Sequence, residues 1–274
     1  MIAINHLSFS YGKKEVLSDI CLSLEEGHIY GLLGENGVGK TTLLTLLCGL
    51  KRPAAGEIST DGHRPFDREP SLLEGQFYLP DEVLPLPMSA RAFGRSRSGF
   101  WPNFRIDKYL DLLRDFEVNA SDRMDQMSSG QLKKTWIAFG LACRTKYYYM
   151  DEPTNGLDIP SKAQFRKILA REAADDSIVV ISTHQVRDLE NSIDSVVILE
   201  PCSVAVNASL EQISRAFRFD TLDTLSPAAL YSEIVPGGIL QVLPNTSGEE
   251  SKVNIEALFN ALHANRETVR NLLK

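Results

Sequence analysis

The chain has 274 residues, of which 43% are hydrophobic and 8% aromatic, with a formal net charge of −7 and an isoelectric point near 5.3. This composition is ordinary for a globular protein, and the length allows one large domain or a core with a small appendage. The acidic balance excludes a general basic surface for nucleic acid, so no nucleic-acid partner is expected.

Targeting signals and cysteine spacing indicate the compartment. No apolar run approaches the roughly 18 to 20 residues that span a bilayer, and residues 1–6 lack the basic and apolar segments of a signal peptide. A cytoplasmic chain is therefore expected. The cysteines are scattered without a C-x-x-C pair, which predicts core residues in a reducing compartment rather than a metal site or disulfides; they are Cys21, Cys48, Cys143 and Cys202.

Short strands are predicted at the start of the chain. Apolar and polar residues alternate over residues 2–11 and again over residues 16–24, with a turn at residues 12–14 between them. This alternation predicts a partly antiparallel sheet. Tyr11 stands at the end of the first strand beside the turn, where its ring is placed to stack on a base. A half-buried strand tyrosine is the alternative interpretation.

A phosphate-binding loop is predicted next. Residues 34–42 read Gly-Glu-Asn-Gly-Val-Gly-Lys-Thr-Thr and fit the pattern G-x-x-x-x-G-K-[ST]. In this pattern the glycines let N–H groups surround phosphate oxygens, Lys40 reaches the outer phosphates and Thr41 ligates Mg²⁺. A buried strand is predicted before the loop, over residues 28–33, and a leucine-rich helix after it, over residues 41–50. The helix N-terminus adds partial positive charge, so the sequence predicts a nucleotide site.

The middle of the chain changes character. Residues 57–60 and 76–79 are predicted strands, whereas residues 84–102 combine prolines, arginines and aromatics. We interpret this last stretch as irregular surface structure leading into an interaction region, with a loop around a small helical subdomain as the alternative. Residues 106–116 have the apolar spacing of an amphipathic helix.

A short polar turn opens a second helix. Residues 127–131 read Met-Ser-Ser-Gly-Gln and precede an apolar helical pattern. Such a turn offers free N–H groups and hydroxyls to an anion. Serine and glycine are also ordinary helix starts, so the turn alone does not decide between the two interpretations.

Acidic side chains end the next predicted strand. Residues 147–152 read Tyr-Tyr-Tyr-Met-Asp-Glu, and acids at the carboxyl end of a parallel strand face the ligand crevice of an α/β sheet. Asp151 is placed to hold Mg²⁺ through water and Glu152 to orient the water that attacks the γ-phosphate. Solvated strand-end acids are the alternative. His184 follows another predicted strand, over residues 177–182, and its strand-end position favours the phosphate site. Residues 196–199 are one more predicted strand.

The last part of the chain predicts a small α+β appendage. Residues 229–234 and 239–243 flank a Pro-Gly-Gly turn and predict a hairpin. A polar loop then leads to a terminal helix with one apolar face, formed by Ile255, Leu258, Phe259 and Leu262. The sequence does not choose among regulation, dimerisation and simple packing for this appendage.

Together these motifs resemble the nucleotide-binding subunit of an ATP-binding cassette (ABC) transporter over about residues 1–215. The resemblance implies an α/β fold with a P-loop NTPase core, in which helices flank a mostly parallel sheet. It also implies an N-terminal antiparallel β subdomain and a helical signature subdomain at about residues 82–145. Residues 216–274 then form the C-terminal accessory α+β region.

The resemblance also implies roles for individual residues. ATP is bound by Tyr11, as the adenine-stacking aromatic, and by the Walker A loop, Gly34, Glu35, Asn36, Gly37, Val38, Gly39, Lys40, Thr41 and Thr42. The signature acts in trans through Ser128, Ser129, Gly130 and Gln131, and Asp158 is the D-loop residue. The catalytic residues are Lys40, Glu152 as catalytic glutamate and His184 as switch histidine. Mg²⁺ is held by Thr41 and the Walker B residue Asp151, with Asp81 as a further candidate.

Three positions depart from the family pattern. Asp81 replaces the usual glutamine, with a shorter and anionic side chain, and Met127 and Ser129 replace leucine and glycine in the signature. Three consecutive tyrosines in the Walker B strand are also unusual, because each buried hydroxyl needs a hydrogen-bond partner.

The family mechanism implies two partners. Two cassettes pair head to tail as a homodimer or heterodimer, ATP closes the pair, and hydrolysis reopens it. A separate transmembrane permease is implied, docked near residues 81–101. Residues 100–104 and 154–158 most resemble exporters of the ABC-2 type. The chain is thus expected to be an ATPase that energises export of an unknown substrate, peripheral on the cytoplasmic face of the cell membrane.

Two other functions stay open. A soluble cassette ATPase that drives a cytosolic assembly, such as iron–sulfur cluster assembly, would share every nucleotide motif. A nucleotide-sensing module that hardly hydrolyses ATP is the third hypothesis. Asp81 favours it, whereas Glu152 and His184 argue against it.

Overall fold

A central six-stranded sheet organises the chain in this computed structural model, which describes residues 1–190, 192–249 and 251–273. The strand order is β5-β6-β7-β3-β8-β9. Neighbouring strands pair in parallel except β9, which runs antiparallel to β8. This confirms the predicted mostly parallel sheet. The strands are β3 (His28–Leu33), β5 (Gln76–Leu79), β6 (Tyr147–Asp151), β7 (Ile178–Thr183), β8 (Ser195–Glu200) and β9 (Ser203–Ser209).

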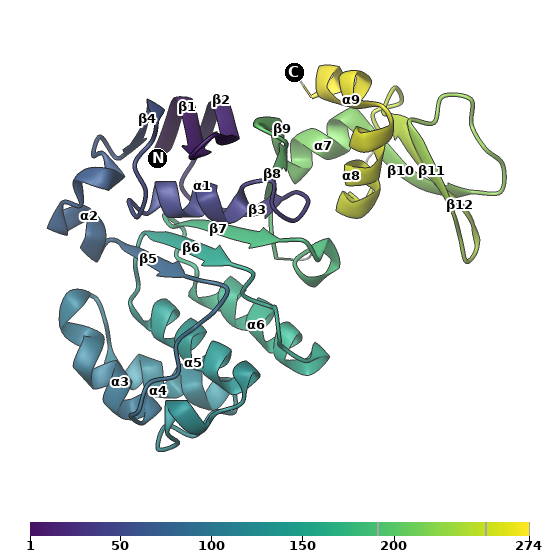
Figure 1. Cartoon of the computed structure of the whole chain (residues 1–274). Helices are drawn as coiled ribbons and strands as arrows, with labels where there is room; N and C mark the ends of the chain where they lie inside the picture. Colours follow the sequence, from purple (N-terminus) through teal and green to yellow (C-terminus); the bar gives the residue numbers. More distant parts are fainter. Residues whose placement is uncertain (191, 250, 274) are drawn as a thin grey trace.

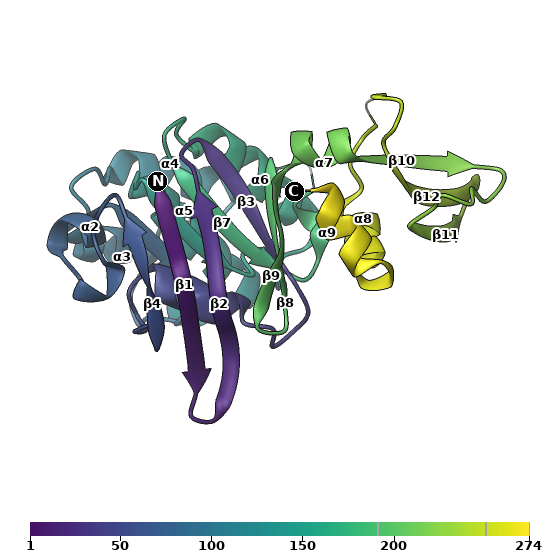
Figure 2. The same cartoon turned by 90° about the horizontal axis from the view of Figure 1, so that it is seen from above.

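A smaller antiparallel sheet covers one face of the core. Its order is β2-β1-β4, with β1 (Ile2–Tyr11), β2 (Lys14–Leu24) and β4 (Ala55–Thr60). Helix α1 (Lys40–Leu47) lies between this sheet and the central one (Figure 1). In the view from above, β1 and β2 form a long ribbon (Figure 2). Apolar residues of both sheets and of α1 form one continuous core, so the predicted N-terminal β subdomain is confirmed.

Helices cover the opposite face of the central sheet. Figure 1 shows α3 (Ala90–Arg97), α4 (Ile106–Asp115) and α5 (Ser129–Ala142) gathered together, with α6 (Ile159–Glu172) beside them. These helices and the sheet enclose a second core. The predicted helical subdomain is therefore present. None of the helices in the three described ranges has the length and apolar character of a membrane span.

Strand β6 explains the three tyrosines. Tyr147 and Tyr149 belong to the core beside α1, whereas Tyr148 belongs to the helical core, because successive strand residues point to opposite faces. The Tyr147 hydroxyl donates to Asp61 Oδ2 at 2.5 Å, and the Tyr148 hydroxyl accepts from the backbone N–H of Thr145 at 3.0 Å. The buried Tyr149 hydroxyl makes no hydrogen bond within the described residues.

Some elements of the structure were predicted as irregular or were not predicted from the sequence. Residues 84–102 are not wholly irregular, because α3 forms there with Ser89 as its cap, accepting from Ala92 N–H at 3.2 Å. The missed elements are short except α6, which has Pro160 as its second residue. They are α2 (Pro70–Glu74), α6, α7 (Leu210–Ala216), α9 (Arg266–Leu272), β9, β10 (Phe217–Leu222) and the 3₁₀ turns η1 (Pro65–Asp67), η2 (Ser98–Phe100), η3 (Met124–Gln126) and η4 (Val186–Asp188).

The C-terminal region forms a third sheet with helices. Strands β11 (Tyr231–Val235) and β12 (Gly238–Pro244) form the predicted hairpin, and β10 pairs with the other side of β12. Helix α8 (Ile255–Ala264) confirms the predicted terminal helix, and it contacts η4 of the cassette. Arg187 Nε lies 2.6 Å from Glu256 Oε2 across this contact. The domain boundary near residue 215 falls within α7 and stays a prediction.

The cysteines are only partly as predicted. Cys48 and Cys143 are buried, but Cys21 is exposed and Cys202 is partly exposed, so assigning all four to the core was wrong. The reason for Cys21 is strand alternation, since its neighbours Ile20 and Leu22 point inward and turn it to the outer face of β2. All four are free thiols.

Candidate nucleotide-binding site

A cavity of about 480 Å³ lies where β3 and β6 end. Its lining comes from the loop after β3, the start of α1, the β1–β2 turn region and the segments after β5, β6 and β7. This position is the usual ligand crevice at the carboxyl ends of parallel strands. The lining residues are Tyr11, Lys14, Val16, Asn36, Gly37, Gly39, Lys40, Thr41, Thr42, Asp81, Asp151, Glu152, Asn155 and His184.

The loop before α1 depends on its glycines. Gly34 has φ +149° and Gly39 has φ +119°, both in the region that L side chains rarely adopt. A Cβ at Gly34 would lie 2.7 Å from the Leu199 carbonyl oxygen, and one at Gly39 would lie 2.9 Å from Val16 Cγ1. Any side chain at either position would therefore distort the loop that faces the cavity.

Lys40 places a positive charge within this loop. Its Nζ donates to the carbonyl oxygens of Gly34 at 2.8 Å and Glu35 at 3.1 Å, and the residue is only 7% exposed. Burial lowers the pKa of Lys40, while the charges of Glu152 and Asp151 act in the opposite direction. The backbone of the loop thus holds the amine at the cavity, beside the two acids.

Thr41 and Asp151 form a cluster of hard oxygen donors. The Thr41 hydroxyl donates to Asp151 Oδ2 at 2.6 Å, and the Ser182 hydroxyl donates to Asp151 Oδ1 at 2.5 Å. Asp151 is 3% exposed. A hydroxyl and a carboxylate facing one cavity fit the preference of Mg²⁺ for oxygen ligands. The sequence did not predict a role for Ser182. This residue lies beside Asp151 because β6 pairs with β7.

Glu152 has an unusual backbone conformation and a histidine partner. Its φ is +44°, which is costly for a residue other than glycine, and its N–H donates to the Ser182 carbonyl at 3.1 Å. Its Oε1 lies 2.8 Å from His184 Nδ1. Backbone strain of this kind concentrates at functional sites, and here it directs a carboxylate toward the cavity.

The negative charge of Asp81 is balanced by a buried lysine, Lys133, that was not predicted from the sequence. Lys133 Nζ lies 3.5 Å from Asp81 Oδ1 and also donates to the Asp81 carbonyl oxygen. Asn155 Nδ2 donates to Asp81 Oδ1 at 3.1 Å. Burial lowers the pKa of Lys133, and the nearby charge of Asp81 opposes this shift. Because Lys133 lies on α5, this pair joins the cavity to the helix opened by residues 128–131.

Tyr11 presents its ring at the edge of the cavity. It is 48% exposed, its hydroxyl lies 3.3 Å from Thr42 Oγ1, and Phe9 packs edge-on with ring centroids 5.0 Å apart. Lys51 Nζ lies 4.9 Å from the ring centroid. An exposed aromatic face beside the phosphate-binding loop is suited to stacking on a base.

The remaining predicted residues lie outside the lining of this cavity. Ser128 caps α5, donating its N–H to Gln131 and accepting the N–H of Gln131, with Ser129 and Gly130 in the first turn. Asp158 caps α6 by accepting the Ser161 N–H at 2.9 Å. Val38 is buried, and Gly34 and Glu35 line a neighbouring cavity of about 460 Å³ with His184, η4 and α8.

Strand, glycine loop and helix, with a lysine and strand-end acids around one cavity, define a P-loop nucleotide-binding protein. The family model described as ABC transporter matches residues 17–155, about half of the chain. The chain therefore belongs to the ABC transporter family, as an ATP-binding subunit of the kind that hydrolyses ATP.

Known relatives agree with this assignment. The chain is 26% identical to the ABC transporter ATP-binding protein YtrB of Bacillus subtilis, over 98% of this chain and 96% of the relative. It is 29% identical to the lipopolysaccharide export ATP-binding protein LptB of Haemophilus influenzae, over 78% and 92%. It is 34% identical to the zinc import ATP-binding protein ZnuC of Yersinia enterocolitica, over 58% and 60%.

A solved structure shares the fold. The chain superposes on the ATP-binding subunit of an ABC transporter with a TM-score of 0.71 and 26% identity, covering 78% of this chain and 92% of the other. The predicted α/β fold and the predicted family are therefore both confirmed.

Proposed function

We propose that this chain energises export through a separate membrane permease, by closing on a second cassette when ATP binds and reopening after hydrolysis. The observation that carries the proposal is the convergence of Lys40, Thr41, Asp151, Glu152 and His184 on one cavity. The five residues come from three separate segments of the chain, and each has the chemical group that ATP hydrolysis needs at that place.

Within the site, each group has a distinct task. Lys40 and the loop N–H groups hold the phosphates, and Tyr11 supports the base. Thr41 and Asp151 would hold Mg²⁺, which supplies charge neutralisation when bound. Glu152 accepts a hydrogen bond from the attacking water, and His184 orients the Glu152 carboxylate through their 2.8 Å contact. Asp81 takes the glutamine position with its charge balanced by Lys133.

A second cassette would complete the site. Residues 128–131 begin α5 outside the cavity, and Ser128 is exposed at the N-terminus of this helix. A helix N-terminus attracts anions, so this end of α5 is suited to the phosphates bound by a facing copy. Asp158, exposed at the cap of α6, belongs to the same proposed interface.

An apolar groove supports a permease as the other partner. A cavity of about 630 Å³ opens between the sheet and the helical subdomain. Its lining includes Phe100 and Leu84, which are 63% and 69% exposed, beside Trp101 and Trp136. Exposed large apolar side chains around a groove are typical of protein contact surfaces. We assign this groove to the permease, which would hold the chain on the cytoplasmic face of the membrane.

Export is the direction favoured by residues 100–104 and 154–158, which resemble exporters of the ABC-2 type. The matched relatives named for lipopolysaccharide export and for zinc import differ in direction. Direction is therefore measured by comparing substrate accumulation in cells that have or lack the chain.

Affinity purification from the native host tests the proposal. The tagged chain is expected to fractionate with membranes and to copurify with a polytopic membrane protein, and Phe100→Asp is expected to lose that partner while retaining ATP hydrolysis. Recovery only in soluble complexes would overturn the permease assignment and favour a cytosolic assembly ATPase. Glu267→Gln, a change at an exposed residue of α9, is the control that keeps the partner.

A further inference from the structure

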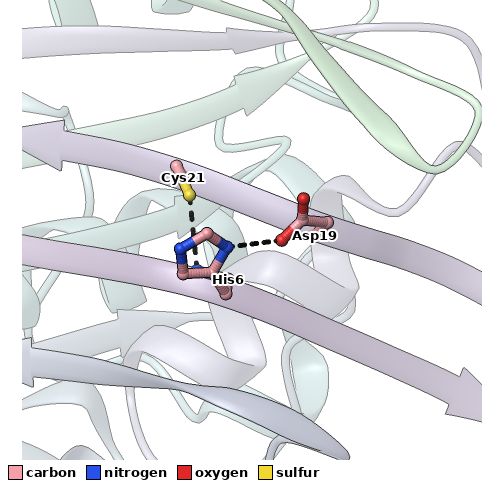
Figure 3. Close-up of side chains that lie close together, drawn as sticks. All are labelled: His6, Asp19 and Cys21. Atoms are coloured by element: carbon pink, nitrogen blue, oxygen red, sulfur yellow. Dashed lines mark hydrogen bonds and ion pairs between the residues drawn. The ribbon is translucent and has the colours of Figure 1, made fainter.

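Three side chains of types that can ligate a metal meet on the outer face of the β1–β2 ribbon. His6 Nδ1 lies 2.6 Å from Asp19 Oδ1, and Cys21 Sγ accepts a hydrogen bond from the His6 backbone N–H at 3.4 Å. One donor atom from each residue lies within 4.8 Å of the other two. Figure 3 shows the imidazole between the thiol and the carboxylate. No other such group of three occurs within residues 1–190, 192–249 and 251–273.

The backbone departs from regular strand geometry to bring these residues together. His6 has φ +50° and Asp19 has φ +52°, a conformation that is costly for residues other than glycine. The β1–β2 register shifts between Ile4 and Leu7, beside His6, and again between Leu7 and Phe9, opposite Asp19. Bulges of this kind redirect side chains. All three donor residues are consequently exposed on one face.

We propose that His6, Asp19 and Cys21 bind a first-row divalent cation of borderline softness, with Zn²⁺ as the representative ion. A thiolate, an imidazole and a carboxylate are the protein ligands of Zn²⁺, at roughly 2.0 to 2.3 Å, and three of them leave a fourth position for water. Mg²⁺ and Ca²⁺ prefer oxygen ligands throughout, so the sulfur and nitrogen donors disfavour them. The donor atoms lie within 4.8 Å of one another, and exposed side chains can rotate to direct all three at one ion.

Metal binding would release one proton and cross-link two strands. The Cys21 thiol becomes a thiolate ligand, and its proton is released to solvent. The metal replaces the direct contact between His6 and Asp19 and cross-links β1 to β2. None of the three residues lines the 480 Å³ cavity. The metal site is therefore separate from the oxygen-donor cluster of Thr41 and Asp151.

Cobalt substitution tests the proposal on the full-length protein. Co²⁺ is titrated into nucleotide-free protein held with excess Mg²⁺, which competes for the oxygen donors Thr41 and Asp151. The expected result is one Co²⁺ per chain with a thiolate-to-cobalt charge-transfer band, which disappears when Zn²⁺ is added. Cys21→Ser should abolish the band. His6→Asn and Asp19→Asn each remove a ligand, so they should weaken Zn²⁺ binding by at least the roughly tenfold that loss of an outer-shell partner costs. Asparagine tolerates the positive φ at both positions.

Matched variants separate this site from adventitious binding. Cys202→Ser removes the other cysteine with solvent access and should leave the band and the affinity unchanged. ATP hydrolysis by each variant shows that it folds, since its catalytic residues lie elsewhere. Absence of the band in the wild-type protein, persistence of the band in Cys21→Ser, or equal Zn²⁺ affinity in His6→Asn would each overturn the proposal.

Discussion

Nδ1 of His184 lies 2.8 Å from Oε1 of Glu152, and Glu152 is held there by a backbone with φ +44°. Strand β7 ends just before His184 and β6 ends just before Glu152, so the contact depends on the pairing of these two strands. The carboxylate is therefore oriented from two directions, by its own strained backbone and by the imidazole.

Glu152→Gln tests the role of this carboxylate. We expect the rate of ATP hydrolysis to fall by about 10²-fold or more, because glutamine does not accept a proton from water. ATP-dependent dimers should persist, since the residues that hold the phosphates are unchanged. Turnover assays and light scattering measure the two effects. Glu267→Gln makes the same charge change on α9 and should hydrolyse ATP at the wild-type rate; full activity in Glu152→Gln would contradict the assignment.

His184→Ala tests whether the histidine acts through Glu152. The proposed roles place both residues on the same water, so we expect the double variant with Glu152→Gln to lose little more activity than Glu152→Gln alone. Single-turnover hydrolysis of the two single variants and the double variant measures this coupling. Losses that multiply would mean that His184 acts independently of the carboxylate.

The pair formed by buried Lys133 and partly exposed Asp81 should show an energetic coupling between the two charges. Lys133→Met should lower the free energy of unfolding by about 1 to 3 kcal/mol, because the carbonyl oxygens of Pro80 and Asp81 also lose their donor. A cycle with Asp81→Asn should give a coupling near 1 kcal/mol, limited by the partial exposure of Asp81. Urea unfolding provides both values. Lys134→Met changes the adjacent half-buried lysine and should alter stability by less than about 0.5 kcal/mol.

We expect the substitution of tyrosine by phenylalanine to have different effects on stability at Tyr147 and Tyr149 of β6. Tyr149→Phe removes a buried hydroxyl that makes no hydrogen bond with the described residues, so stability should stay equal or rise by up to about 1 kcal/mol. Tyr147→Phe removes the 2.5 Å hydrogen bond to Asp61 and should cost about 1 kcal/mol or more. Thermal and urea unfolding compare the pair, and equal losses would show that the Tyr149 hydroxyl has a partner in solution.

The lowered pKa of Asp61 should make the stability of the protein depend on pH. Burial would raise the pKa of Asp61, but hydrogen bonds from Lys146, the terminal amine and Tyr147 outweigh it and hold the pKa below its ordinary value. A depressed folded pKa contributes stability that is complete above the unfolded value near 3.9 and is lost as the pH falls through the folded pKa.

The variant Asp61→Asn measures this contribution. It should be less stable than the wild type at pH 7, and the difference should shrink as the pH falls below about 4. Asparagine tolerates the φ of +48° at this position, so the backbone is kept. Asp223→Asn, at an exposed position, should track the wild type throughout. A difference that stays constant down to pH 3 would contradict the depressed pKa.

The sequence predicted the parts of the site that are local in the chain. Residues 34–42 have a fixed spacing, and Asp151, Glu152 and His184 follow recognisable strands, so their meeting at one sheet edge could be foreseen. Lys133 could not, because nothing in an apolar helical pattern shows that its amine reaches Asp81. Ser182 likewise depends on which strands become neighbours.

Register explains the other misses. His6 and Cys21 lie 15 residues apart, and only the bulged pairing of β1 with β2 brings them together. A C-x-x-C pattern indicates only metal ligands that are close together in the sequence, and it therefore does not indicate ligands that come from two paired strands. Helix α3 was missed because the prolines and arginines around it are typical of loops, whereas the cap at Ser89 and the packing of Phe93 decide its structure.

The contact between α8 and η4 places the C-terminal appendage against the segment that follows His184. His184 is followed within two residues by η4, and Arg187 of η4 pairs with Glu256 of α8. If nucleotide binding changes this contact, the nucleotide site and α8 are linked in both directions. A molecule that binds α8 and changes the nucleotide affinity by some factor then has its own affinity changed by nucleotide by the same factor.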